Sequence, residues 1–546
     1  MIDQGEGEGG AMDSSSMTRR DWLARSAVLG AVPALATGMA GVFAGGFAGA
    51  MVSSGETADT SCRAREVREG DAAGPIEIGS RRELFLDRQL VESSRDIQWQ
   101  MGTPQPQEVA IECDEPWEGS ACGYFRVLRD GGKYRMWYMT YHWPFTPEEK
   151  ANEKKPKHPF YVAYAESDDG VTWRKPQLGL YEFAGSKANN ICCIDVIDNF
   201  TPFIDTKPGC PPDARYKAVG IGKGGLLAFV SPDGIHWQRM QEAPVITKGA
   251  FDTQNIAFWD AAIGKYRVYI RDFHDGIRDI RTCTSDDFKT WTAPESLRFQ
   301  AGLPDEQLYT NGVEPYYRAP HIYIGFPTRY VERPWSISMR ALPDLEHREW
   351  RSKAEQRIGT AITDGLLMSS RDGVHFERWG EAFIRNGIER PGTWVYGDCY
   401  QAYGLVETAG KFPGAPNELS LYLPENYWHK AARMRRYSLR VDGFVSARAG
   451  FMGGELTTRL IRFAGKSLSM NFSTSAAGNV RVELVDAEGK PYPGYAFDDC
   501  DELFGDTLDR TVTWREKPDL SSLAGKAVKV RFRLRDADLY SYRFSE

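Results

Sequence analysis

Short segments in which apolar and polar residues alternate recur along the chain and predict β-strands, since successive side chains of a strand point to opposite faces. Five of these segments are evenly patterned, and no long helical periodicity competes with them. They are KYRMWYM at 133–139, RYKAVGI at 215–221, KYRVYIR at 265–271, HIYIGFP at 321–327 and ELSLYLP at 418–424. The pattern favours an all-β protein.

A short turn motif follows each of these strands. It reads SDDGVTW at 167–173, SPDGIHW at 231–237, SDDFKTW at 285–291 and SRDGVHF at 370–376, with a weaker copy, LRVDGF, at 439–444. Asp before Gly is typical of a tight hairpin turn, the serine can bond the turn backbone, and the aromatic residue packs between neighbouring sheets. We therefore expect structural roles for Asp168, Asp233, Asp286 and Asp372.

Five strands interleaved with five turns predict a five-bladed β-propeller over residues 79–452, because five such units close a ring without a long exposed edge. The uneven spacing of the turns predicts insertions at 142–160 and 328–360, and loops of that length tend to cover a site. After Gly453 the strands LSMNFST, VRVELVD and VKVRFRL follow without the motif. They predict a C-terminal β-sandwich over 453–546, with a sixth blade as the alternative.

The N-terminal 52 residues have the composition of an export signal. TRRDWL at 18–23 contains the pair Arg19 and Arg20, and an Ala/Gly-rich apolar run from Ala27 to about Val52 follows it. This resembles a twin-arginine signal, and the polar, small residues at 53–78 are typical of a linker. We expect a periplasmic or secreted protein, or one anchored by the uncleaved signal, with no later membrane segment.

Charge and cysteine content narrow the partners. The net charge of −8 is spread along the chain without a basic block, so nucleic acid is not an expected partner. The nine cysteines form no CxxC pair and have no histidine at zinc spacing, so we expect no metal and no other cofactor. For Cys113 and Cys122 a disulfide and a pair of buried thiols both remain open.

The innermost strands of a propeller begin at one mouth of its central channel, so residues near those starts face a shared pocket. We place the five starts near Glu118, Asn190, Asp252, Glu314 and Asp398. Four of these residues are carboxylates, and like charges held close raise one another's pKa at a cost in stability. Such a gathering indicates proton chemistry.

Hydrolysis of a glycosidic bond requires one carboxylic acid to protonate the leaving oxygen and one carboxylate to attack the anomeric carbon or activate water. We predict Glu314 as the general acid, Glu118 as the base or nucleophile and Asp252 as the orienting or pKa-setting carboxylate. The candidate substrate-binding residues are Asn190, Asn255, Arg271, Asp272, Arg318, Arg329 and Asp398. Aromatic candidates for a sugar platform are Trp143, Trp259, Tyr316 and Trp394, whereas Asp364 is expected to be structural.

With these residues in place, the chain from about 80 to 546 resembles the clan of invertases, levanases and arabinanases. These are five-bladed propeller glycosidases that often carry a C-terminal β-sandwich. The segments ELFLDRQLVES, PWEGSACGYF and LRDADLYSYRF look typical of an uncharacterised bacterial branch similar to that clan.

The resemblance implies acids on the first three blades, one of them in an Arg-Asp-Pro sequence. Here Glu118 falls at the first-blade position, Asn190 at the second, and Arg271-Asp272 is followed by Phe, while Glu314 is in blade four. We therefore predict a glycoside hydrolase acting on an oligo- or polysaccharide. The alternatives are a non-catalytic carbohydrate-binding propeller and a lyase acting on an acidic sugar.

Overall fold

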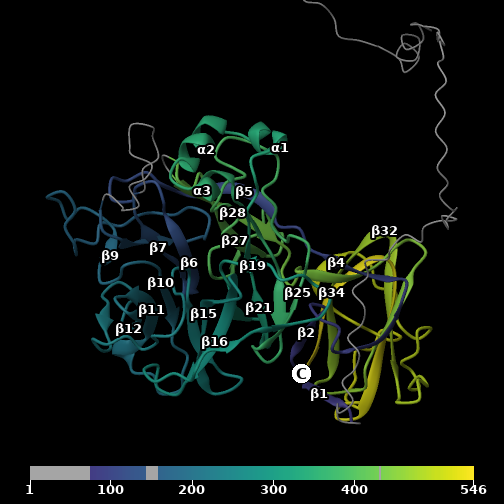
Figure 1. Cartoon of the computed structure of the whole chain (residues 1–546). Helices are drawn as coiled ribbons and strands as arrows, with labels where there is room; N and C mark the ends of the chain where they lie inside the picture. Colours follow the sequence, from purple (N-terminus) through teal and green to yellow (C-terminus); the bar gives the residue numbers. More distant parts are fainter. Residues whose placement is uncertain (1–73, 143–157, 430–431) are drawn as a thin grey trace, which may run out of the picture. The chain divides into compact units, whose positions relative to one another are not determined.

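The computed structural model describes residues 74–142, 158–429 and 432–546 (Figure 1). The predicted export signal, most of the linker and most of the 142–160 insertion lie outside these residues. The described part is mainly β-structure, and no helix in it is long and apolar enough to cross a membrane.

Five sheets of successive chain segments form the blades of a β-propeller, as the repeat predicts. Blade one holds β6 (Gly123–Asp130), β7 (Lys133–Thr140), β8 (Tyr161–Ser167) and β9 (Ile191–Cys193). Blade two holds β10 (Phe200–Ile204), β11 (Tyr216–Gly222), β12 (Gly225–Ser231) and β13 (Gln238–Arg239), with a 3₁₀ turn at Pro212–Ala214. Blade three holds β14 (Ile256–Asp260), β15 (Lys265–His274), β16 (Ile277–Ser285) and β17 (Glu295–Ser296).

The last two blades complete the ring. Blade four holds β20 (Glu314–Tyr316), β21 (Ala319–Gly325), β24 (Met368–Ser370) and β25 (His375–Arg378), which β18 (Arg298–Phe299) joins in parallel. Blade five holds β26 (Val406–Thr408), β27 (Glu418–Glu425) and β28 (Ala432–Leu439). Its outer strand is β5 (Gln105–Cys113), which precedes blade one in the chain and pairs with β28. The ring is thus closed by hydrogen bonds between its first and last strands.

The repeated turn makes the same hydrogen bonds in blades one to four. In blade one the Oγ of Ser167 accepts from the N–H groups of Asp169 and Gly170, and Oδ1 of Asp169 accepts from those of Val171 and Thr172. The corresponding pairs in the other blades are Ser231 with Asp233, Ser285 with Asp287 and Ser370 with Asp372. The structural acids are therefore Asp169 and Asp287 where we expected their neighbours Asp168 and Asp286.

Hydrogen bonds between blades end on these same turns. Trp137 of blade one donates its indole N–H to the carbonyl of Gly234 in blade two, at 2.7 Å. Tyr269 and Tyr422 donate in the same way to Gly373 and Gly170, at 2.9 and 2.5 Å. Each turn thus fixes the position of the adjacent blade as well as its own hairpin.

The second sheet system contains the C-terminal strands β29 (Val445–Ala449), β30 (Gly454–Thr458), β31 (Ile461–Phe463), β32 (Ser467–Val485), β33 (Asp506–Thr511) and β34 (Ala527–Ser545). The rings of Phe532 and Tyr542, ten residues apart on β34, lie 5.5 Å apart. A straight strand would separate them by about 33 Å, so β34 bends and its two halves face one another across a shared core as in a β-sandwich.

The boundary of this second domain differs from our expectation. Four N-terminal strands pair with the C-terminal ones: β1 (Ile76–Gly79), β2 (Arg82–Leu84), β3 (Val91–Arg95) and β4 (Ile97–Met101). Residues 76–101, expected in the linker and the propeller, therefore belong to the sandwich. Alternation alone does not reveal the partner of a strand, because pairing joins segments more than 300 residues apart.

The insertion at 328–360 is the helical part of the fold. It contains α1 (Ile337–Ala341), α2 (Leu345–Ser352) and α3 (Gln356–Thr360) between β22 (Thr328–Val331) and β23 (Ile362–Gly365), which form a small sheet with β19 (Gln307–Leu308). Figure 1 shows the three helices together at one end of the propeller. Ser336 caps α1 by accepting from the N–H of Met339.

Candidate active site

Two aspartates lie where neighbouring inner strands begin. Asp198 precedes β10 of blade two, and Asp252 precedes β14 of blade three. Asp198 is half-buried, whereas the side chain of Asp252 is 66% exposed. Since both strands start at the same mouth of the channel, their carboxyl groups face a common site.

The environment of Asp198 favours its protonated form. Burial raises the pKa of its carboxyl group to about 7, and the negative charge of Asp252 adds to the rise. The backbone N–H of Asn199 and the positive charge of Arg271 act in the opposite direction. A carboxylic acid with this pKa can hold a proton near neutrality and release it during a reaction.

Arg271 fixes the second aspartate. Its Nη2 donates to Oδ1 of Asp252, its Nε donates to the carbonyl of Ala250 at 3.2 Å, and its side chain is 4% exposed. The guanidinium also lies over the ring of Tyr309, 5.2 Å from its centroid. The side chain of Asp252 is thereby held in a defined position at the mouth.

Tyrosines surround the two acids. The hydroxyl of Tyr124 donates to the backbone carbonyl of Asp252 at 3.4 Å, and the hydroxyls of Tyr141 and Tyr427 bond to one another. Tyr396 donates to the hydroxyl of Tyr309 at 2.9 Å. Burial raises the pKa of each of these phenols, so they are hydroxyl donors and acceptors at neutral pH. Aromatic faces with hydroxyl groups suit a polyol ligand.

Backbone strain gathers in the same loops. Tyr124, Cys399 and Trp428 have φ values of 49°, 60° and 64°, in the left-handed region that bulky side chains avoid. Such conformations cost of order 1–3 kcal/mol each and persist where the surrounding structure imposes them, often at functional sites.

Asp398 lies on the blade-five side, in the loop before β26. It is 3% exposed, and burial raises the pKa of its carboxyl group to about 7. Its Oδ2 accepts from the N–H of Val395 at 3.3 Å and from Asn386 at 3.4 Å, whereas Oδ1 is buried with no hydrogen-bond partner among the described residues.

Glu118 has a different place from the one we expected. It is fully buried inside blade one, where its carboxylate accepts from Tyr138 at 2.5 Å and from the backbone N–H of Glu115 at 2.9 Å, and pairs with Lys175 at 2.8 Å. With these partners both of its oxygens are engaged in the interior. The geometry therefore makes Glu118 a structural charge and does not join it to Asp252.

Glu314 begins the inner strand of blade four, as predicted, but lies deeper in the channel. Its carboxylate accepts from the N–H of Leu405 at 3.0 Å and lies 3.7 Å from Arg126, whose Nε donates to the carbonyl of Pro202 in the middle of β10. Burial raises the pKa of Glu314, and Arg126 opposes that rise. The structure does not bring Glu118, Asp252 and Glu314 to one point.

Two of the predicted binding residues are buried amides. The Nδ2 of Asn190 donates to Tyr138 and to the carbonyl of Tyr164, and the residue precedes β9, the outer strand of blade one. Asn255 precedes the inner strand β14, and its Nδ2 donates to the carbonyls of Phe251 and Thr253. Both amides hold loops, so Asn190 is not at the mouth and Asn255 lies beneath it.

Three charged candidates are engaged in ion pairs. Asp272 pairs with Arg281 at 2.9 Å, and Arg329 binds both carboxylate oxygens of Asp364, which is structural as expected. Arg318 lies at the turn between β20 and β21, the opposite end of blade four from the mouth, and pairs with Asp442 at 3.0 Å. Of the predicted binding residues, Arg271, which binds Asp252, and Asp398, on the blade-five side, are the two that fit a site at the channel mouth.

The aromatic residues predicted as sugar platforms have other surroundings than the tyrosines described above. Trp143 lies outside the described residues. Tyr316 is 1% exposed and donates to Asp442, Trp259 packs against Tyr266 within blade three, and the indole of Trp394 donates to the carbonyl of Gly387. These interactions lie away from Asp198 and Asp252, whereas Tyr124 donates to the backbone carbonyl of Asp252.

Asp198 is the residue that sequence reasoning missed. We placed the start of blade two at Asn190, but that segment leads into β9 of blade one. The signal was the short strand FTPFI at 200–204, one hairpin before RYKAVGI and immediately after Asp198 and Asn199. Counting strands backward from each turn motif would have located it.

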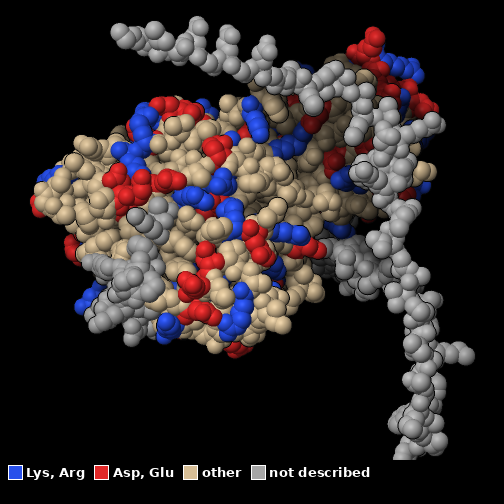
Figure 2. All heavy atoms as spheres, turned by 90° about the horizontal axis from the view of Figure 1, so that it is seen from above, with Lys and Arg blue, Asp and Glu red and all other residues tan. Residues whose placement is uncertain are grey.

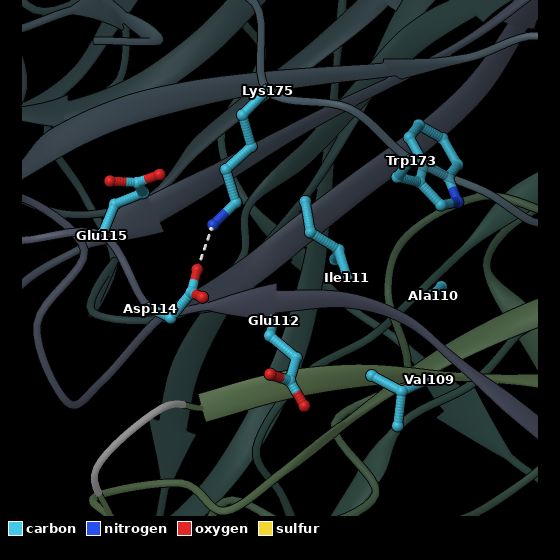
Figure 3. Close-up of a pocket in the computed structure, with 8 residues that line it drawn as sticks. All are labelled: Val109, Ala110, Ile111, Glu112, Asp114, Glu115, Trp173 and Lys175. Atoms are coloured by element: carbon cyan, nitrogen blue, oxygen red, sulfur yellow. Dashed lines mark hydrogen bonds and ion pairs between the residues drawn. The ribbon is translucent and has the colours of Figure 1, made fainter.

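A separate hollow of about 560 Å³ lies on the outside of the ring, along β5 and the 173–175 segment of blade one. Figure 3 shows its lining, in which Lys175 reaches Asp114 at 3.0 Å. Its lining includes none of the mouth residues, and its single lysine already pairs with Asp114 and Glu118. We therefore place the candidate site at the channel mouth.

No group of three or more His, Cys, Asp or Glu side chains among the described residues is arranged to hold a metal ion. Cys113 and Cys122 are both buried free thiols, and the thiol of Cys122 donates to the backbone carbonyl of Glu118 at 3.3 Å. On the face seen in Figure 2, acidic and basic side chains are interspersed over the coloured surface.

Comparison with known proteins gives the following. No protein-family model matches the chain. It is 25% identical over 159 residues to the uncharacterised protein Rv1502 of Mycobacterium tuberculosis, a match that covers 28% of this chain and 44% of that protein. The chain thus matches less than half the length of this curated relative.

The chain is similar to several solved structures. One is a family 43 arabinoxylan arabinofuranohydrolase from Bacillus subtilis, with 12% identity, a TM-score of 0.36 and coverage of 81% of this chain and 99% of that one. Another is an N-acetylgalactosamine deacetylase from F. plautii, with 13% identity, a TM-score of 0.40 and coverage of 63% and 96%.

Proposed function

We propose that this protein is a glycoside hydrolase in which Asp198 is the general acid and Asp252 is the base or nucleophile. The observation that carries the proposal is the pairing of a protonatable carboxyl group with a fixed carboxylate at one channel mouth. Two carboxyl groups whose surroundings separate their protonation states are the requirement of this chemistry.

The reaction follows from these roles. Asp198 donates its proton to the glycosidic oxygen as the bond from that oxygen to the anomeric carbon breaks. Asp252 either takes a proton from the attacking water or attacks the anomeric carbon itself, after which Asp198 takes a proton from the water that releases the sugar. Arg271 holds Asp252 in position, and the tyrosine hydroxyls bind the hydroxyl groups of the substrate.

The experiment is a screen of plant, algal and bacterial polysaccharides for release of reducing ends. Asp198→Asn keeps the shape of the side chain and removes its proton, so we expect a loss of roughly a hundredfold or more. Asp195→Asn is a matched control, since Asp195 is exposed and three residues away. Equal turnover by Asp198→Asn and the wild type would remove the assignment.

The products separate the alternatives. Binding without any product indicates a carbohydrate-binding propeller, and an unsaturated sugar at the new end indicates a lyase. The anomer that forms first, followed by NMR, distinguishes a base from a nucleophile at Asp252, because inversion and retention give opposite anomers.

We also propose that the chain is exported by the twin-arginine route, which rests on the pair Arg19 and Arg20 before the apolar run. Replacement of both by lysine should leave the protein in the cytoplasm. Fractionation of cells that express the wild type and the double variant measures this directly.

A further inference from the structure

Arg351 of α2 is a buried cation with unused hydrogen-bonding capacity toward the described residues. Its residue is 3% exposed, and its Nε and Nη2 are buried without a hydrogen-bond partner among the described residues. An unpaired guanidinium in the interior costs several kcal/mol. A ligand that supplies the missing acceptors would remove that cost.

The neighbouring Arg348 shows what a structural arginine looks like in the same helix. Its Nε donates to the carbonyl of Pro343 at 2.8 Å, and its Nη2 donates to those of Thr393 and Trp394 at 3.1 and 2.6 Å. Arg348 thereby ties α2 to the loop before blade five. Arg351, one turn further along, makes no such bonds to the described residues through its Nε and Nη2.

Arg351 faces the aromatic side of the channel mouth. Its guanidinium lies over the ring of Trp428, 4.4 Å from the centroid, and it interacts electrostatically with Tyr427 and Tyr396. Tyr427 bonds to Tyr141, and Tyr396 bonds to Tyr309, the tyrosine beneath Arg271. The two arginines therefore lie on either side of one group of tyrosines.

Arg351 forms no ion pair with a carboxylate among the described residues. Burial and the adjacent Arg348 lower its pKa to about 9, so it is still protonated at neutral pH. Asp398 is the nearby acid, but it makes no ion pair with Arg351, and one of its own oxygens is buried without a partner. Within the described part of the chain, the charge of Arg351 is therefore available to an anionic ligand.

We propose that Arg351 binds the anionic group of an acidic saccharide, a carboxylate or a sulfate ester, at the blade-five side of the mouth. The buried Nη1 of Arg271, which also has no partner among the described residues, faces the other side of the tyrosine group. The inference rests on the proposed function only in taking the mouth as a saccharide site. It narrows the substrate to sugars that carry a negative charge.

The test measures binding of defined probes to the full chain by calorimetry. Oligogalacturonate and oligoguluronate supply carboxylates, a chondroitin sulfate oligosaccharide supplies sulfate esters, and carboxyl-reduced oligogalacturonate is the neutral control. Asp198→Asn is used as the background so that no probe is consumed. We expect an acidic probe to bind and its neutral counterpart to bind at least tenfold more weakly, the value of about one charge-assisted hydrogen bond.

Variants of Arg351 test whether this residue causes the preference for acidic probes. Arg351→Gln should weaken binding of the acidic probe roughly ten- to a hundredfold and leave the neutral probe unchanged, while Arg351→Lys should lie between it and the wild type. Arg340→Gln, at an exposed arginine of α1, is the matched control. Without ligand, Arg351→Met should have an unfolding temperature equal to or above that of the wild type, because it removes an unpaired buried charge.

The outcomes separate this inference from the proposed function. Acidic-probe binding that depends on Arg351, with no hydrolysis of any polysaccharide, supports the inference while the proposed function fails. If the protein hydrolyses a neutral glycan and Arg351→Gln hydrolyses it at the same rate, the inference is overturned and the proposed function stands. Absence of binding to every acidic probe also overturns it, as does a large drop in the unfolding temperature of Arg351→Met.

Discussion

The negative charge of Asp252 raises the pKa of Asp198, its counterpart at the start of the adjacent blade. The two residues precede β14 and β10, so the propeller geometry places them at one mouth although 54 residues of chain separate them. Arg271 binds Asp252 from behind, and burial acts on Asp198. The carboxyl group of Asp198 can thus hold a proton near neutrality, and that of Asp252 is bound to a cation.

This relationship predicts a specific titration. We expect the carboxyl carbon of Asp198, followed by NMR, to titrate near pH 7 in the wild type and at lower pH in Asp252→Asn, because the neighbouring charge has been removed. If catalysis uses the protonated form, activity falls as pH rises through 7. A wild-type titration below pH 5 would contradict the assignment of Asp198 as the acid.

Arg271→Met should lower kcat/KM by about a hundredfold, since Asp252 loses the group that holds its carboxylate in place. Arg281→Met is the comparison, because Arg281 lies on the neighbouring strand and pairs with Asp272. We expect that control to retain most of its activity. Steady-state kinetics on the substrate found in the screen provide the measurement, and equal losses in the two variants would show a general effect of charge removal.

Glu118 and Lys175 should affect stability and leave the chemistry intact. Lys175→Met leaves the carboxylate of Glu118 buried without its cation, which is expected to cost about 3–5 kcal/mol of unfolding free energy. Glu118→Gln retains the shape of the side chain, and its folded fraction should turn over substrate at the wild-type rate. Denaturant unfolding measures the first effect, and a catalytically dead but folded Glu118→Gln would restore Glu118 to the active site.

Asp398 should make stability depend on pH. The folded-state pKa of Asp398, about 7, lies above its ordinary value of roughly 3.9. Its contribution to the free energy of unfolding is therefore fully present below about pH 4 and is lost as pH rises through 7. Asp398→Asn removes this dependence. We expect the variant to unfold at a higher temperature than the wild type at pH 8, with no such advantage at pH 4, and thermal scans at both values check the sign.

The bond from Trp137 to Gly234 tests how the blades are joined. Trp137→Phe removes one indole donor and should cost about 1 kcal/mol, because the carbonyl of Gly234 still accepts from the indole of Trp237 at 3.1 Å. Gly234→Ala should cost more, since φ is +79° and the added Cβ would lie 2.9 Å from the Trp137 ring. Val230→Ala, on the adjacent strand, controls for loss of packing alone, and a neutral result for Gly234→Ala would count against the role of the turn.

Much of the fold follows from local sequence. The five segments with alternating polarity are the second strands of the five blades, β7, β11, β15, β21 and β27, and four of the turns have the same serine and aspartate hydrogen bonds. Both features depend on neighbours within a few residues. Local pattern is therefore sufficient to recognise them.

The site depended on longer-range information. Asp198 was missed and Glu118 was misplaced because inner strands are short, three to eight residues here, and carry little periodic signal. A carboxylate at such a strand start and one enclosed by Tyr138 and Lys175 look alike in sequence. Their difference lies in contacts with residues 20 and 57 positions away.

The strands β1 to β4 and β29 to β34 enclose the propeller in chain order, so in topological terms the ring is an insertion within the sandwich. A cut at residue 452 would deprive the sandwich of five strands, β1 to β4 and β29, and would separate β1, β2 and β3 from their partners β31, β34 and β30. A fragment intended to fold as a free propeller must instead run from 102 to 444. It retains β5, the strand that joins the two ends of the ring.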